Sequence, residues 1–237
     1  MVPLRDDNPI KITPYATYGL IAVNVLIFLY EASLPSAALT NFFHQWAIVP
    51  RELTVSFETG FNYPAWSEWN TLVTSQFLHG GFLHVVGNML YLWIFGNNLE
   101  EQLGRAKYLF FYLACGVLAG LTQWFVDPGS TVPSLGASGA IAGVMGAYIF
   151  RFPQVRILTL VPIGLLLPFR IPAIYFLGFW FIEQAAYGVL SLEAPASLGM
   201  DGGVAYWAHA GGFVFGAILG WLLGLFDKTD DVIEEAS

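Results

Sequence analysis

Six long apolar stretches constrain the fold of this 237-residue chain more than any other feature. Crossing the hydrocarbon core of a bilayer takes about 20 mostly apolar residues. Only 11% of the residues are Asp, Glu, Lys or Arg, less than half of the roughly 25% that is usual in soluble domains. The sequence therefore predicts an all-α, polytopic membrane protein with six transmembrane helices. The expected spans are Tyr15–Leu34, Leu83–Leu103, Tyr108–Val126, Ala137–Phe152, Ile171–Leu190 and Val204–Phe226.

The charge and the cysteine content exclude several classes of protein. The formal net charge is −8, and without a basic patch the chain is not expected to bind nucleic acid. Cys115 is the single cysteine, so an intrachain disulfide framework or a multi-cysteine metal site is excluded. The sequence also lacks the His-Glu-x-x-His pattern of zinc proteases. We expect neither a metal nor another cofactor.

The remaining segments divide the chain into a membrane domain and two short ends. We expect residues 1–14 to be a cytoplasmic N-terminus, 15–226 the membrane domain, and 227–237 an acidic cytoplasmic tail. The first loop, residues 35–82, contains aromatic residues, which favour the headgroup region, among them Trp46, Phe57, Phe61, Tyr63, Trp66 and Trp69. This loop is expected to associate with the membrane surface, and a small extramembrane cap is the alternative.

The apolar segment Val155–Phe169 is interpreted as an interfacial loop. Prolines interrupt this region at Pro153, Pro162 and Pro168, and Arg156 and Arg170 flank it. A seventh span is the alternative for this segment.

The basic residues predict the orientation in the membrane, because cytoplasmic loops retain Lys and Arg. With six spans, one side carries eight basic residues and the other side carries Arg51 alone. The eight are Arg5, Lys11, Arg105, Lys107, Arg151, Arg156, Arg170 and Lys228. Both termini are therefore expected in the cytoplasm, with an uncleaved first span rather than a signal peptide. The short termini favour a location in the plasma membrane.

Four polar residues fall at corresponding depths inside the expected spans: His84, Asn88, Ser138 and His209. Polar groups are costly in hydrocarbon, so each suggests a functional site. The second, fourth and sixth spans, which carry them, all begin on the non-cytoplasmic side. We therefore expect these residues to gather a little below that surface.

Glycine spacing predicts that the fourth and sixth spans approach closely. Gly212, Gly216, Gly220 and Gly224 repeat every fourth residue, and Gly139, Gly143 and Gly146 provide a small-residue face on the fourth span. Such faces allow helix backbones to come close together. This packing would bring the Ser138 hydroxyl within reach of a ring nitrogen of His209.

A serine paired with a neutral histidine is typical of nucleophilic catalysis, because the histidine accepts the hydroxyl proton. Acyl transfer also needs donors aimed at the developing oxyanion, and His84, Asn88 and the Ser138 backbone N–H could supply them. We expect a Ser–His dyad. Glu183 in the fifth span could be a third member, although a structural role is favoured.

The pattern resembles the rhomboid family of intramembrane serine proteases over roughly Trp69 to Leu225. The segments that carry the resemblance are His79-Gly80-Gly81-Phe82-Leu83-His84 with Asn88, then Gly136-Ala137-Ser138-Gly139, then Ala208-His209-Ala210-Gly211-Gly212. Glu100 to Gly104 with Arg105 is similar to the family's loop after the second span.

The resemblance implies the six-helix rhomboid fold, with Ser138 as nucleophile and His209 as general base and acid. It implies His84 and Asn88 as oxyanion-hole residues, in a water-filled cavity open to the non-cytoplasmic side. The implied activity is hydrolysis of peptide bonds in or next to transmembrane segments of membrane-protein substrates within the lipid bilayer.

Two positions depart from the family pattern. Many members have a Trp-Arg pair where this chain has Asn70 and Thr71, so the anchoring of the first loop must differ. Some members place an aromatic ring one turn after the serine, where this chain has Ala142, so another contact must hold His209.

A catalytically inactive relative that binds membrane clients is the alternative function. A small transporter is disfavoured, because no internal repeat is evident.

Overall fold

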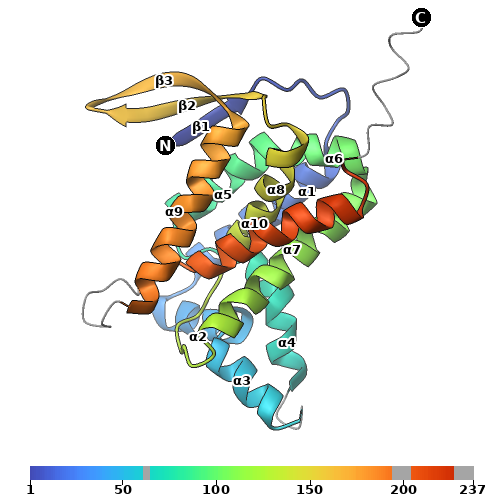
Figure 1. The fold of residues 1–237 in the computed structure, drawn as a ribbon. Helices are drawn as coiled ribbons and strands as arrows, with labels where there is room; N and C mark the ends of the chain where they lie inside the picture. The colour runs from blue at the N-terminus through green and yellow to red at the C-terminus, as the bar shows by residue number, and fades with distance from the viewer. Residues whose placement is uncertain (61–64, 194–203, 227–237) are drawn as a thin grey trace, which may run out of the picture.

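A computed structural model describes residues 1–60, 65–193 and 204–226 of the chain (Figure 1). The fold is mostly helical, as predicted, with a small sheet at one end. The helices are α1 (Tyr15–Ser33), α2 (Ser36–Trp46), α3 (Pro50–Glu58), α4 (Ala65–Thr74), the 3₁₀ turn η1 (Ser75–Phe77), α5 (Phe82–Tyr91), the π-helical η2 (Leu92–Gly96), α6 (Asn97–Leu103), α7 (Arg105–Val126), α8 (Ser138–Arg151), α9 (Ala173–Glu193) and α10 (Tyr206–Leu222). The strands are β1 (Val2–Asp6), β2 (Arg156–Ile163) and β3 (Leu165–Pro172).

Helix α8 forms the centre of the bundle. All residues from Gly139 to Tyr148 are buried, and the helix packs against α5, α7, α9 and α10. Six of these ten residues are glycine or alanine, which allows the neighbouring backbones to approach closely. The serine of interest therefore begins a helix that other helices enclose.

The glycines of α8 and α10 lie directly against each other. A Cβ atom at Gly212 would collide with the Gly139 carbonyl oxygen, and one at Gly216 would collide with the Gly143 backbone. On another side of α8, a Cβ atom at Gly143 would lie 2.5 Å from the Cβ and Sγ atoms of Cys115 in α7. No larger side chain fits at these crossings without moving a helix.

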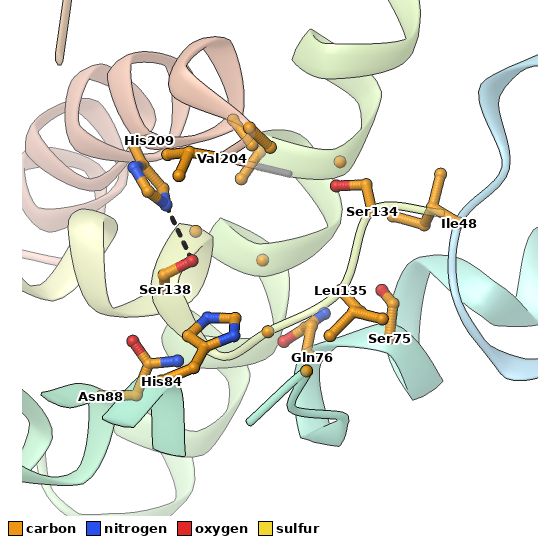
Figure 2. A pocket seen from close by; sticks show the side chains of 18 of the residues that line it. Ile48, Ser75, Gln76, His84, Asn88, Ser134, Leu135, Ser138, Val204 and His209 are labelled. Atoms are coloured by element: carbon orange, nitrogen blue, oxygen red, sulfur yellow. Dashed lines mark hydrogen bonds between the residues drawn. The ribbon is translucent and has the colours of Figure 1, made fainter. Parts of the chain in front are cut away.

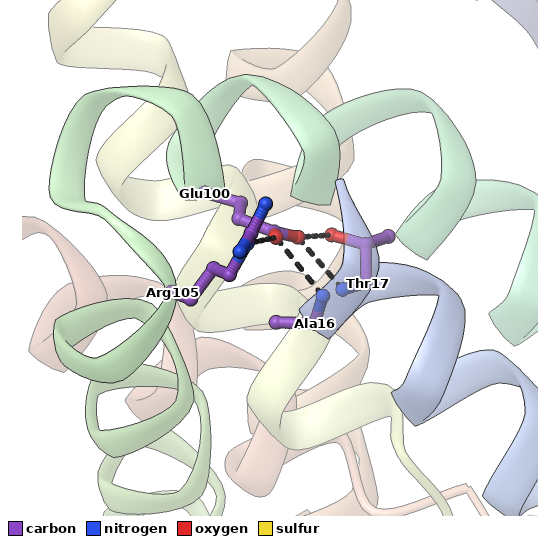
Figure 3. A network of polar contacts seen from close by, with 4 residues as sticks. All are labelled: Ala16, Thr17, Glu100 and Arg105. Atoms are coloured by element: carbon purple, nitrogen blue, oxygen red, sulfur yellow. Dashed lines mark hydrogen bonds and ion pairs between the residues drawn. The ribbon is translucent and has the colours of Figure 1, made fainter. Parts of the chain in front are cut away.

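The N-terminus of α1 is capped by a residue from another helix (Figure 3). The buried Glu100 carboxylate of α6 accepts hydrogen bonds from the backbone N–H groups of Ala16 (2.9 Å) and Thr17 (2.7 Å) and from the Thr17 hydroxyl (2.8 Å). Arg105 lies 3.9 Å from the same carboxylate. The first N–H groups of a helix have no intrahelical acceptor, and a carboxylate there also complements the helix dipole. Glu100 thus fixes α1 against the end of α6.

The expected second span, Leu83–Leu103, forms one continuous helix, Phe82–Leu103, with a change of helical type inside it. It consists of α5, η2 and α6, with a π-helical segment at Leu92–Gly96. A Cβ atom at Gly96 would lie 2.9 Å from Leu92 Cδ1 and 3.4 Å from the Thr17 methyl group of α1. The π segment therefore packs against α1 at Thr17.

The segment interpreted as an interfacial loop is a β-hairpin. Strand β2 pairs antiparallel with β3, from Arg156↔Pro172 to Ile163↔Leu165, and β1 pairs antiparallel with the other edge of β2. Gly164 takes φ +76° at the turn, a conformation that glycine adopts without strain. The hairpin projects beyond the upper end of α9, and the N-terminus lies beside it (Figure 1). Residues Leu165 to Arg170 are exposed on both faces of β3.

The described part of the first loop folds into α2, α3, α4 and η1, at the end of the bundle opposite the sheet (Figure 1). Ile48 exchanges both backbone hydrogen bonds with Ser134, in the segment that leads into α8. The indole of Trp69 donates to Ser56 at 3.2 Å, and that of Trp124 donates to Thr54 at 2.9 Å. These contacts anchor the loop where Asn70 and Thr71 replace the family's Trp-Arg pair.

Three helices among the described residues are long and apolar enough to cross a membrane by themselves: Tyr15–Ser33, Arg105–Val126 and Ala173–Leu192. A fourth candidate is the pair Glu68–Phe77 and Phe82–Leu103, whose halves meet at 81°. Helices α8 and α10 have 14 and 17 residues and are shorter than a full span. The aromatic residues Phe61 and Tyr63 and the acidic tail lie outside the described residues.

Candidate active site

A cavity of about 800 Å³ lies at the end of the bundle that carries the first-loop helices (Figure 2). It is bounded by the starts of α5, α8 and α10, by η1, by α7, and by the connection from α7 to α8. The four polar residues singled out from the sequence all line it: His84, Asn88, Ser138 and His209.

Ser138 and His209 are hydrogen-bonded across this cavity. The distance between Ser138 Oγ and His209 Nε2 is 2.8 Å (Figure 2). Ser138 is the first residue of α8, and His209 lies in the first turns of α10. The close glycine contacts between α8 and α10 allow two such short side chains to meet.

The other ring nitrogen of His209 contacts α9. His209 Nδ1 lies 2.7 Å from Gln184 Oε1. An amide oxygen can only accept, so Nδ1 carries the proton, and Nε2 is left to accept the Ser138 hydroxyl. Trp180, one turn earlier on α9, tilts at 35° toward the His209 ring with centroids 5.8 Å apart. These contacts hold the histidine where the sequence has Ala142 instead of an aromatic residue.

Sequence reasoning did not assign a role to Gln184. The sequence feature that could have indicated Gln184 is a polar side chain within an apolar span. The adjacent Glu183 has the same feature, so the sequence did not distinguish the two residues. Both ring nitrogens of His209 are already engaged, one by Ser138 and one by Gln184. Glu183 is therefore not the partner of this histidine in the structure.

His84 lies directly against the turn that leads into α8. A Cβ atom at Gly136 would lie 2.8 Å from His84 Nε2 and 3.5 Å from Ser138 Oγ. Gly136 has φ +129°, and its N–H donates to the Ser75 carbonyl at 2.9 Å. A glycine at this position therefore makes room for the His84 ring beside the serine.

Asn88 is positioned by His79. Its Nδ2 donates to His79 Nε2 at 2.9 Å, and the rings of His79 and His84 meet edge to face with centroids 5.1 Å apart. The His79 backbone N–H donates to the buried Glu31 carboxylate of α1 at 3.2 Å. Asn88 keeps a second N–H that this bond does not use.

The start of α8 supplies backbone donors beside Ser138. The N-cap residue is Ala137, and no side chain among the described residues caps this end. The first N–H groups of a helix lack intrahelical acceptors and carry the positive end of its dipole. This end of α8 can therefore stabilise negative charge that develops next to the serine.

Comparison with known proteins identifies the family. A family model described as the Rhomboid domain matches residues 66–226. The chain belongs to the rhomboid family. It is 29% identical over 213 residues to Rhomboid protein 1, mitochondrial, of Saccharomyces cerevisiae, which covers 87% of this chain and 52% of the yeast protein.

Two bacterial relatives come from Bacillus subtilis. The putative rhomboid protease YdcA is 30% identical over 60% of this chain and 64% of its own length. The rhomboid protease GluP is 35% identical over 58% of this chain and 24% of its own length. The chain thus spans less than two thirds of each of these three relatives. Other rhomboid relatives are named mitochondrial or chloroplastic, so family membership alone does not assign the kind of membrane.

Proposed function

We propose that this protein is an intramembrane serine endopeptidase that cleaves peptide bonds in or next to transmembrane segments of membrane proteins. The observation that carries the proposal is the 2.8 Å contact between Ser138 Oγ and His209 Nε2 inside an 800 Å³ cavity. Two bacterial relatives named as rhomboid proteases support it.

In the proposed reaction, His209 Nε2 removes the Ser138 proton as Oγ attacks the scissile carbonyl carbon. The resulting tetrahedral intermediate places negative charge on the former carbonyl oxygen. His209 then donates its proton to the leaving amide nitrogen, which leaves an acyl-enzyme on Ser138. Water, activated by the same histidine, hydrolyses this ester and regenerates the serine.

The oxyanion is proposed to lie between the start of α8 and α5. The Ser138 backbone N–H, the His84 ring and the free N–H of Asn88 are the donors. Removing one such donor from a serine protease typically lowers kcat by about 100- to 1000-fold.

We propose six transmembrane helices: α1, the continuous unit α5–η2–α6, α7, α8, α9 and α10. At 14 residues, α8 is about 21 Å long, too short to cross the full hydrocarbon core. Its enclosure by other helices supports a start below the surface, with the 127–137 connection and the cavity above it. The protein is proposed to lie in the plasma membrane. The end of the bundle that carries the sheet then faces the cytoplasm.

A substrate helix hides its carbonyl groups in hydrogen bonds, so it must unwind locally before Ser138 can attack. Glycine or proline near the cleavage point would lower the cost of unwinding, because both are poor helix formers. The proposed substrates are therefore membrane proteins with a weak helical segment.

The test uses purified protein in detergent and a fluorophosphonate probe, which reacts with activated serines. We expect labelling of the wild type, none of Ser138→Ala, and at most a trace of His209→Ala. Ser130→Ala, in the segment before α8, is the matched control and should label as the wild type does. A folded wild type that reacts neither with this probe nor with a second serine-reactive probe would refute the dyad. It would favour the client-binding alternative.

A further inference from the structure

We propose that Gln184 is the positioning residue of the dyad: its side-chain oxygen holds the His209 ring in the tautomer that can accept the serine proton. This inference rests on the proposed function for its catalytic consequence. The structural observation that supports it is the 2.7 Å contact between Gln184 Oε1 and His209 Nδ1.

The chemistry of the two groups assigns the direction of this hydrogen bond. Neutral imidazole has one N–H and one lone pair, and either nitrogen can carry the proton. A Gln Oε1 atom offers no proton, so it stabilises the form with hydrogen on Nδ1. Nε2 then faces Ser138 as an acceptor, which a general base requires. Without Gln184, the opposite tautomer would present an N–H to the serine hydroxyl and could not take its proton.

The register between α9 and α10 is fixed on both sides of this contact. Toward the start of α9, the Phe181 ring stacks on Phe213 with centroids 4.8 Å apart. Toward its end, the Trp207 indole donates to the Gly188 carbonyl at 3.1 Å. A Cβ atom at Gly188 would lie 3.2 Å from that indole, so glycine permits the close approach. Gln184 lies between these two contacts and is buried, with 9% of its surface exposed.

Gln184 contributes an acceptor where serine proteases with a triad use a carboxylate. A carboxylate orients the ring and also stabilises the imidazolium that forms during attack. A neutral amide orients the ring and costs less to bury in a membrane interior than an ion does. The structure thus assigns orientation to Gln184, with little stabilisation of charge.

The experiment compares four variants with the wild type. Gln184→Met keeps the length of the side chain and removes the acceptor, whereas Gln184→Glu keeps an acceptor at the same position. Gln123→Met is the matched control, because Gln123 Oε1 also bonds α10, at the Ala208 backbone N–H (3.3 Å), without touching the ring. Glu183→Gln tests the neighbouring carboxylate. Melting temperatures in detergent verify that each variant is folded.

Two readouts separate positioning from general stability. The first is the ¹⁵N NMR spectrum of histidine-labelled protein, with the His209 signals assigned by their loss in His209→Ala. Wild type, Gln184→Glu and Gln123→Met should show a protonated Nδ1, and Gln184→Met should show a mixture of both tautomers. The second is the rate of fluorophosphonate labelling. It should fall about tenfold in Gln184→Met, as expected for the loss of one hydrogen bond, and remain within about threefold of wild type in the other variants.

The outcomes distinguish this inference from the proposed function. A folded Gln184→Met with the wild-type tautomer and labelling rate would overturn the role of Gln184 and leave the dyad standing. If the wild type does not label at all, the proposed function fails, and the NMR spectrum still decides whether Gln184 sets the tautomer. If Gln184→Met is unstable, Gln184→Asn, which is one methylene shorter, replaces it with the same expected loss.

Discussion

The Tyr148 hydroxyl donates a 2.6 Å hydrogen bond to the Asp6 carboxylate. Asp6 ends the first strand of the sheet, and Tyr148 lies in the last turns of α8, the helix that begins with Ser138. Asn98 of α6 donates to the same carboxylate at 2.8 Å. One acidic side chain therefore joins the sheet to two helices at the end of the bundle opposite the cavity.

Tyr148→Phe should destabilise the protein by about 1–3 kcal/mol, because it removes a donor from a partly buried carboxylate. Thermal unfolding in detergent should show a melting temperature lower by about 2–4 °C for each kcal/mol. Tyr112→Phe is the matched control, since the Tyr112 hydroxyl is buried and has no hydrogen-bond partner among the described residues. Equal effects of the two substitutions would contradict the importance of the Asp6 contact.

Asp6 should also make stability depend on pH. Burial raises the pKa of its carboxyl above 3.8, although the Tyr148 and Asn98 hydrogen bonds oppose this shift. The folded state therefore binds the proton more tightly than the unfolded state does. The resulting stabilisation is complete below pH 3.8 and is lost as the pH rises through the raised pKa.

Asp6→Asn cannot titrate and isolates this effect. The melting temperature of the wild type, relative to that of Asp6→Asn, should decrease as the pH increases from about 3.5 to 7. A relative melting temperature that increases over this range would show that the hydrogen bonds outweigh burial.

The helices could be predicted from the long apolar segments of the sequence. The contacts between residues distant in the sequence could not. The fifth span was expected at Ile171–Leu190 and α9 covers Ala173–Glu193, because about 20 apolar residues specify a helix by themselves. Strand β1 was not predicted, since five residues carry little periodic signal and their partner β2 lies about 150 residues away. The hairpin was missed for a related reason: its apolar residues do not alternate with polar ones, because both faces of β3 are exposed.

In the candidate site, too, some features could be predicted from the sequence and others depend on tertiary packing. The spacing of Ser138 and His209 within their helices suggested that they approach, and the structure has their polar atoms 2.8 Å apart. The choice between Glu183 and Gln184 could not be made from sequence, because adjacent residues of a helix differ by 100° in direction. That choice depends on the rotation of α9 about its axis, which side chains such as Phe181 and Trp207 determine through packing. The catalytic roles of these residues stay predictions.

Gly136→Ala should disturb the candidate site much more than a glycine-to-alanine substitution elsewhere in the same connection does. The new methyl group would lie 2.8 Å from His84 Nε2, and φ +129° is strained for alanine by about 1–3 kcal/mol. Displacing His84 by about 1 Å would lower the fluorophosphonate labelling rate about 100-fold. Gly129→Ala, in the same connection, is the control, because its Cβ would meet no atom of the described residues within 4 Å. Near-normal labelling of a folded Gly136→Ala would show that His84 is not needed at its observed position.

The proposed orientation predicts opposite accessibility for the two ends of the bundle. Glu58 at the end of α3 and Gln154 before β2 are both exposed. Native Cys115 is fully buried and should give little background with a membrane-impermeant maleimide. In intact spheroplasts that express the protein in a bacterial plasma membrane, Glu58→Cys should label, and Gln154→Cys should label only after the membrane is permeabilised.

The reverse labelling pattern would invert the topology and place the cavity on the cytoplasmic side. Labelling of both positions in intact cells would mean that both lie outside, with an even number of crossings between them, and the six-span proposal would be wrong. Because residues 58 and 154 are separated by the α5–η2–α6 unit, α7 and α8, the proposal requires three crossings between them. Helix α8, with 14 residues, is the crossing that this experiment tests most directly, since by length alone it would not qualify as a span.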